Sequence, residues 1–303
     1  MPNATPGSVG AFVAVPPPAA AAAPGLSARL RRDPGGVAAA VVLFLLLLVA
    51  LLAPWIAPHD PNQQFDLVLQ RRQPPSAAHW FGTDAFARDV FSRVIYGARI
   101  SLGISLVAVA VSTLLGTAWG AIAGFVGGAL DALMMRLVDA LLAIPRILLL
   151  LAIVTLWDAL TVPALVLLLG LTSWFPVSRL VRAEVLAARQ RDFVTAARSL
   201  GATPLRLLLR HALPQATGPL TVNAALGVGQ LIVLEAGLAF LGLGVPAPQA
   251  SWGNLIREGF DAFTGAWWLT VVPGVALAAT VVAVNVLADR LRAALNPRQL
   301  PGP

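Results

Sequence analysis

The sequence contains no cysteine, so disulfide bonds, thiolate catalysis and cysteine-based metal sites are all excluded. It also contains no lysine, because all 21 basic residues are arginines. A phosphate-binding P-loop ends in Gly-Lys-Ser/Thr, where the lysine reaches the terminal phosphates. The chain therefore cannot hold a P-loop, and any ATP hydrolysis coupled to it must take place on another polypeptide.

Charged residues are scarce, at 12% of the chain, and 58% of the residues are hydrophobic. Together with a mean hydropathy of +0.80, this lies outside the range of soluble domains. The net charge is +7, but the arginines are not interleaved with aromatic residues, so no nucleic-acid partner is expected. The three histidines, His59, His79 and His211, have neither the spacing of a zinc-protease motif nor that of a catalytic triad. We expect no catalytic, metal or cofactor site, and no enzyme activity.

Apolar stretches that approach or exceed the roughly 20 residues needed to cross a bilayer recur along the chain. They predict an all-α membrane protein with six transmembrane spans: Pro34–Pro58, Ile100–Leu130, Ala140–Trp157, Ala159–Ser178, Ala212–Leu234 and Ala262–Ala288. A loop containing Gly127, Gly128 and Asp131 is expected before the third span, and a tight turn around Asp158 after it. Arg146 interrupts the third span and is expected to snorkel to the inner surface.

The arginine distribution predicts the orientation. With both termini inside, fourteen arginines lie on the inner side and six on the outer side, which follows the positive-inside rule. Residues 1–33, rich in Ala, Pro and Gly, are then a disordered cytoplasmic tail. An uncleaved first span at 34–58, an extracytoplasmic segment at 59–99, a core transmembrane domain at 100–290 and a cytoplasmic tail at 291–303 follow.

Glu235 lies late in the fifth span, near the outer leaflet. An acid in an apolar span is energetically expensive and is by default a candidate for lining a translocation path. The alternative is a carboxylate that is hydrogen-bonded at the membrane interface or paired with an arginine such as Arg99 or Arg257. The sequence leaves both interpretations open.

The segment 184–214, EVLAARQRDFVTAARSLGATPLRLLLRHALP, is rich in arginine although its surroundings are apolar. Its pattern predicts two helices joined by a sharp corner. The first, at about 183–200, should stop at Gly201, because glycine adopts left-handed backbone geometry without strain. Thr203 is a candidate N-cap and Pro204 a candidate first residue of the second helix, which should end at Pro214.

This elbow would leave four leucines available to contact a partner: Leu205, Leu207, Leu208 and Leu209. A membrane protein with such an elbow is suited to pass force or information to a soluble protein. The competing interpretation is an ordinary amphipathic surface helix with arginines on one face.

The spacing of the elbow resembles the EAA motif of ABC-importer permease subunits. Ala196-Ala197, three residues, Gly201, nine residues and then His211-x-Leu213-Pro214 follow the motif, although Thr195 stands where it has glutamate. The resemblance implies a cytoplasmic coupling helix between the fourth and fifth spans that docks into a groove of the ATPase. It assigns this role to Ala196, Ala197, Gly201, Thr203, Pro204, Leu205, Leu207, Leu208, His211, Leu213 and Pro214.

Three further blocks are similar to permeases of the dipeptide/oligopeptide/nickel type: HWFGTDAFARDVFSRVIYGARISLG, LIVLEAGLAFLGLGVPAPQASWGNLI and NVLADRLRAALNPRQL. In the first, Gly82-Thr83-Asp84 predicts a turn that leads into an amphipathic helix, where a purely structural platform is the favoured interpretation. The resemblance runs from the first span to about Arg298. It implies a type I ABC-importer permease, the second, C-type member of the pair, in a bacterial cytoplasmic (inner) membrane.

By the same resemblance, the partners are a second homologous permease in a heterodimer, two ATP-binding-cassette ATPases and an extracytoplasmic substrate-binding protein. A secondary transporter would need intramembrane titratable pairs and usually a visible repeat, whereas only Glu235 and Arg146 are candidates. The cargo stays open among dipeptides, longer peptides, nickel complexes and glutathione.

Overall fold

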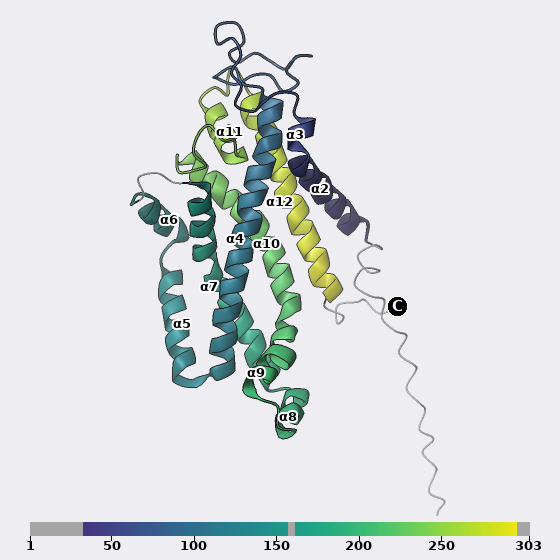
Figure 1. Cartoon of the computed structure of the whole chain (residues 1–303), viewed down its shortest axis with the longest axis vertical. Coiled ribbons are helices and arrows are strands. Elements are labelled where there is room, and N and C mark those ends of the chain that lie inside the picture. Colours follow the sequence, from purple (N-terminus) through teal and green to yellow (C-terminus); the bar gives the residue numbers. More distant parts are fainter. Residues whose placement is uncertain (1–32, 157–160, 296–303) are drawn as a thin grey trace, which may run out of the picture.

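The computed structural model describes residues 33–156 and 161–295 (Figure 1). The elements are α2 (Pro34–Leu51), α3 (Ala53–Ile56), α4 (Val90–Val126), α5 (Gly128–Ala143), α6 (Arg146–Val154), α7 (Val162–Arg189), α8 (Asp192–Ser199), α9 (Pro204–Leu207), the π-helix η1 (Leu208–Ala212), α10 (Leu213–Phe240), α11 (Trp252–Phe260) and α12 (Trp268–Leu295). The only extended pairing in these ranges is an isolated bridge between Thr83 and Asp89, so the predicted all-α class is confirmed. The predicted disordered tail before Asp33, the turn at Asp158 and the residues from 296 onward lie outside the described residues.

The described helices allow five or six membrane spans, and the upper number is the one that the sequence predicts. By length and composition, five helical segments could cross a membrane: α2, α4, α7, the continuous segment Pro204–Phe240 and α12. The pair α5 and α6 passes the same test together, although it is bent by 82° at its break, which brings the number to six. In Figure 1, α2 and α12 lie side by side at one flank of the bundle, and α5 lies at the other.

The third span differs from the prediction in where it starts and where it breaks. The loop expected around Gly127, Gly128 and Asp131 is reduced to Gly127 alone, whose φ of +74° allows α4 to turn directly into α5. Asp131 therefore lies inside a helix. The break comes instead at Ile144, because the residue before a proline is pushed toward extended geometry, and Ile144 has φ −82° and ψ 122°.

Arg146, the first residue of α6, does not reach the inner surface as predicted. Its Nη2 donates to the carbonyl oxygen of Leu169 at 3.4 Å and to the hydroxyl of Ser173. Both acceptors lie in the half of α7 that is remote from the end of α7 at Arg189. The bend before α6 turns this helix across α7, so the guanidinium bonds within the bundle instead of snorkelling.

Close contact between α4 and α7 depends on small residues. Gly116, Gly120 and Gly124 recur every four residues on α4. A Cβ on Gly124 would lie 2.8 Å from the carbonyl oxygen of Arg182 on α7, and one on Gly120 would overlap the carbonyl oxygen of Ser178. Small residues at this spacing allow two helix backbones to approach closely in a membrane. This contact fixes α7 and therefore the position of the segment that follows it.

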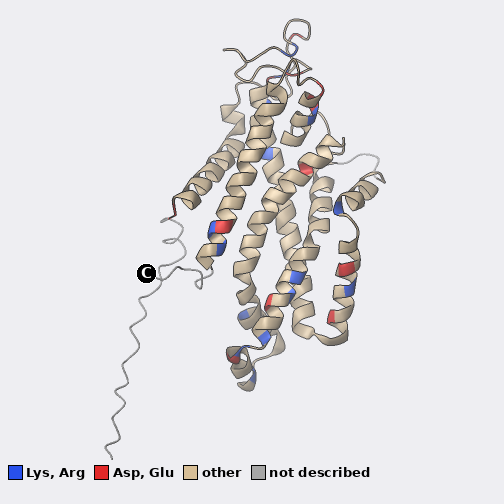
Figure 2. Ribbon diagram, turned by 180° about the vertical axis from the view of Figure 1, so that it is seen from behind, with Lys and Arg blue, Asp and Glu red and all other residues tan. Residues whose placement is uncertain are grey.

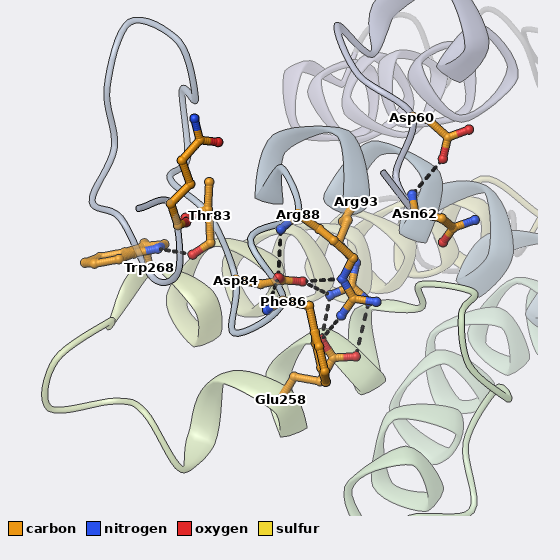
Figure 3. A network of polar contacts seen from close by, with 10 residues as sticks. Asp60, Asn62, Thr83, Asp84, Phe86, Arg88, Arg93, Glu258 and Trp268 are labelled. Carbon is orange, nitrogen blue, oxygen red and sulfur yellow. Dashed lines mark hydrogen bonds and ion pairs between the residues drawn. The ribbon is translucent and has the colours of Figure 1, made fainter. Parts of the chain in front are cut away.

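At the opposite end of the bundle, buried ion pairs tie the polar segment to the helices (Figure 3). Arg93 of α4 is only 1% exposed. Its Nη1 lies 2.6 Å from Asp84 Oδ2 and 2.5 Å from Glu258 Oε2 on α11. Arg88 contacts the same two carboxylates at 2.7 and 3.1 Å. Two arginines and two acids thus join the loop before α4 to α4 and α11, in line with a structural platform.

Candidate functional site

The elbow, residues 190–212, projects from one end of the bundle and connects α7 to α10 (Figure 1). Charged residues gather on it and on the neighbouring helix ends (Figure 2). Four of its arginines are exposed: Arg191, Arg198, Arg206 and Arg210. The elbow is therefore a protruding, basic structure at the end of otherwise apolar helices.

The first helix of the elbow is shorter than predicted. The expected helix at 183–200 is interrupted, because α7 ends at Arg189 and α8 begins at Asp192 after an extended Arg191 with ψ 144°. The interruption coincides with two tertiary hydrogen bonds. Arg189 donates to the Gly124 carbonyl oxygen at 3.1 Å, and Arg191 donates to Gln215 Oε1 at 3.1 Å. No glycine or proline marks the break, so local sequence signals could not predict it.

The corner after α8 has the predicted geometry. Gly201 has φ +83°, and its N–H donates to the Arg198 carbonyl oxygen at 3.0 Å. Thr203 Oγ1 accepts from the N–H of Arg206 at 3.4 Å, and Pro204 stands at the first helical position of α9. The glycine stop, the threonine cap and the proline start are all confirmed.

The second helix of the elbow does not end at Pro214 as predicted. α9 passes into the π-helix η1 and then into α10, so the chain stays helical from Pro204 to Phe240. Pro214 lies in the first turn of α10. A proline cannot donate to the carbonyl four residues earlier, and its ring crowds that carbonyl. The wider π-turn directly before Pro214 accommodates both effects, and it also contains His211, whose Nδ1 lies 3.4 Å from the Arg206 carbonyl oxygen.

The exposed side chains of the elbow differ from those predicted. Leu207 is only 2% exposed, so the expectation that it is available to a partner is wrong. Leu208 and Leu213 are half-buried and pack against a cluster of buried residues on α4, α7 and η1. Ala196 is exposed and Ala197 is half-buried.

Four large apolar side chains of the elbow are exposed, and we call them the elbow surface: Phe193, Leu200, Leu205 and Leu209, at 41, 89, 65 and 53%. The exposure of Leu205 and Leu209 agrees with the sequence prediction. Phe193 and Leu200 were not predicted, because burial in this segment depends on tertiary packing. Exposed apolar groups rimmed by charge mark interaction sites, so this end of the molecule is suited to bind a protein partner.

Glu235 is a separate candidate, and it has no exposed surface. The hydroxyl of Ser101 on α4 donates to its Oε2 at 3.4 Å, and Ser101 also accepts from the backbone N–H of Trp252 on α11 at 3.1 Å. No described arginine forms an ion pair with it. The carboxyl lies where α4, α10 and α11 meet, so the hydrogen-bonded interpretation fits this conformation. A role in a translocation path stays a prediction.

Two models of known protein families match this chain. The family model described as "Binding-protein-dependent transport system inner membrane component" matches residues 116–300. The model described as "N-terminal TM domain of oligopeptide transport permease C" matches residues 27–75.

Among individual relatives, a putative peptide transport system permease protein of Brucella suis is 42% identical over 252 residues, covering 82% of this chain and 83% of the relative. The oligopeptide transport system permease protein OppC of Bacillus subtilis is 39% identical, covering 82% and 81%. The di/tripeptide transport system permease protein DppC of Pseudomonas aeruginosa is 42% identical, covering 82% and 83%. In fold, the chain is similar to a structure of the inward-facing MetNI methionine ABC transporter, with a TM-score of 0.57 at 18% identity, covering 68% of this chain and 97% of that chain.

Proposed function

This chain belongs to the family of binding-protein-dependent transport system inner membrane components, and we propose that it is the second, C-type permease of a peptide importer driven by separate ATPases. Its membership rests on the match over residues 116–300 and on relatives that are 42% identical over most of both chains. The predicted type I ABC-importer permease fold is confirmed. The chain is a multi-pass membrane permease subunit.

The observation that carries the coupling proposal is the elbow surface. Four apolar side chains of the elbow are exposed, while Val194 and Leu207 are buried and Ala212 belongs to the buried cluster shared with α4 and α7. We propose that each elbow docks into a groove of an ATP-binding-cassette ATPase, since this chain has no P-loop lysine of its own. Closure of the two ATPases would then move the helices as packed bodies between inward- and outward-open arrangements.

The orientation proposal places the elbow and both termini in the cytoplasm. The arginine distribution supports it, since the predicted topology assigns fourteen arginines to the inner side and six to the outer side. Arg88 and Arg93 of the outer group are paired with Asp84 and Glu258, so their charges are compensated.

Single cysteines in this cysteine-free chain test the coupling and the orientation together. Val68 is 90% exposed in the polar segment, and Leu200 is 89% exposed on the elbow. An impermeant maleimide should label Val68→Cys in intact cells, and should label Leu200→Cys only in inverted membrane vesicles. Co-expressed ATPases should protect Leu200→Cys but leave Ala129→Cys reactive, an exposed position outside the elbow on the same end. Labelling of Leu200→Cys in intact cells, or labelling that the ATPases leave unchanged, would contradict the proposal.

We propose peptides as the cargo, received from an extracytoplasmic binding protein and passed along a path shared with a second permease. The similar proteins support this choice, since they are named as peptide, dipeptide and oligopeptide permeases. Deletion of the gene should remove uptake of labelled di- or tripeptides, with free amino acid uptake as the control. Unchanged peptide uptake, together with a nickel complex or glutathione co-purifying with the cognate binding protein, would replace peptides by that cargo.

A further inference from the structure

A second cluster of polar side chains lies at the end of the bundle opposite the elbow. His59 follows α3, His79 belongs to the polar segment, and Asp89 caps the N-terminus of α4. One ligand atom from each residue, the two imidazole nitrogens and a carboxylate oxygen, lies within 4.8 Å of the others. His79 and Asp89 are buried, and the side chain of His59 is 28% exposed. Two of the three histidines in the chain thus converge on one carboxylate.

The Nδ1 atom of His59 has no partner within this cluster. It is buried and makes no hydrogen bond, although it lies 3.9 Å from Asp89 Oδ2. His79 Nδ1 lies 2.9 Å from Asp89 Oδ1. A buried polar atom without a partner is costly, and native structures usually satisfy it with a hydrogen bond, a water or an ion.

The distances fit a bound metal. In a tetrahedral zinc site, ligand atoms lie about 2.1 Å from the metal and hence about 3.4 Å from one another. His79 Nδ1 lies 2.9 Å from Asp89 Oδ1 and His59 Nδ1 lies 3.9 Å from Asp89 Oδ2, while the ligand atoms of the three residues all lie within 4.8 Å of one another. Rotation of these side chains would bring one atom from each to the separation of a metal site. Two imidazoles and a carboxylate suit Zn²⁺ and other divalent first-row transition metals, whereas Ca²⁺ and Mg²⁺ prefer oxygen ligands alone. We propose that His59, His79 and Asp89 bind a divalent transition metal of the zinc class, with a water in the fourth position.

The surroundings of the cluster orient its carboxylate as a metal ligand requires. The backbone N–H and the hydroxyl of Ser92 both donate to Asp89 Oδ2, at 2.8 and 2.7 Å, while Oδ1 faces His79 Nδ1. The same hydroxyl accepts from the backbone N–H of His59 at 3.3 Å. Phe65 packs edge-on against both imidazoles, with ring centroids 5.1 and 5.0 Å away. Such supporting hydrogen bonds and an apolar shell strengthen metal binding.

The bound metal replaces the proton between His79 and Asp89 and gives His59 Nδ1 a partner. It joins the exit of the first span, the polar segment and the start of α4 at one point. Metal binding to a folded site stabilises the folded state, so the metal would act as a clamp on this extracytoplasmic structure. The site lies outside the elbow and requires neither ATPases nor cargo.

The experiment uses the full-length chain with a tag free of histidine, stripped of metal by a chelator. Addition of Zn²⁺ should give about one bound ion per chain by elemental analysis and should raise the unfolding temperature. Co²⁺ should give the visible absorption of a tetrahedral site. His59→Ala and Asp89→Asn should lose at least about tenfold in affinity. Asn serves as a helix cap as well as Asp does, so the second variant removes a ligand while preserving the start of α4.

His211→Ala is the matched control, because it removes the third histidine from the opposite end of the molecule and should leave binding unchanged. His59→Ala is expected to fold normally, as shown by an unchanged gel-filtration profile, since this side chain makes no side-chain hydrogen bond. Wild-type protein that holds no more zinc than His59→Ala, or a loss that is equal in His211→Ala, would overturn the proposal.

Discussion

Replacing Gly201 by valine should abolish peptide uptake while leaving the protein inserted in the membrane. Gly201 has φ +83°, and an added Cβ would meet no atom within 4 Å, so the penalty comes from the backbone and not from a clash. Left-handed geometry costs an ordinary residue about 1–2 kcal/mol, and more when the side chain is branched at Cβ. The chain relieves this strain by rotating α9 relative to α8. The elbow surface would then no longer match the ATPase groove.

The measurement is co-purification of the ATPases together with uptake of a labelled dipeptide. Gly201→Asn is the first control, because asparagine tolerates left-handed geometry and should retain most activity. Gly128→Val is the second, since Gly128 has φ +64° and equally open space but lies outside the elbow. It should suffer the same strain and still dock the ATPases. Normal docking and uptake by Gly201→Val would show that the glycine corner is not the coupling device.

Replacing Arg93 by alanine should destabilise the end of the protein opposite the elbow by about 3–5 kcal/mol, the cost of removing one partner from a buried ion pair. The guanidinium is 1% exposed and contacts both Asp84 and Glu258. Asp84 keeps Arg88 as a partner, but this buried carboxylate loses one of its two arginines, whereas Glu258 is exposed enough to be hydrated. The contact between α4 and α11 through this network would then weaken.

Thermal unfolding of the purified protein in detergent measures this effect, and limited proteolysis of the polar segment reports where the structure opens. Arg71→Ala is the matched control, because Arg71 is an exposed arginine of the same segment and exposed charges contribute little. An unfolding temperature for Arg93→Ala equal to that of Arg71→Ala would mean that the network does not support the fold.

Features that depend on a single segment could be predicted. Hydropathy measures the free energy of transferring one stretch of chain into lipid, so the span count and the all-α class follow from the sequence. The corner at Gly201, Thr203 and Pro204 was also predictable, because left-handed geometry, capping and a fixed φ are local properties. The lack of lysine excluded a P-loop without any structure.

Burial within the elbow could not be predicted, although its residues could be located. The four consecutive residues Leu205, Arg206, Leu207 and Leu208 differ in burial, and only the tertiary packing of the elbow decides which of them is covered. For this reason Leu207 is buried and Leu205 is 65% exposed. The break between α7 and α8 has the same origin, since its hydrogen bonds reach to Gly124 and Gln215.

The sequence by itself determined the class of protein, its lack of a P-loop and the place of the elbow, because composition and local backbone preference are enough for each. The tertiary structure decided which apolar side chains face a partner and what surrounds Glu235. It also brought His59 and His79 to Asp89, over separations of 30 and 10 residues that match no local metal motif. Such contacts depend on how distant helices and loops pack together, and no single segment encodes that packing.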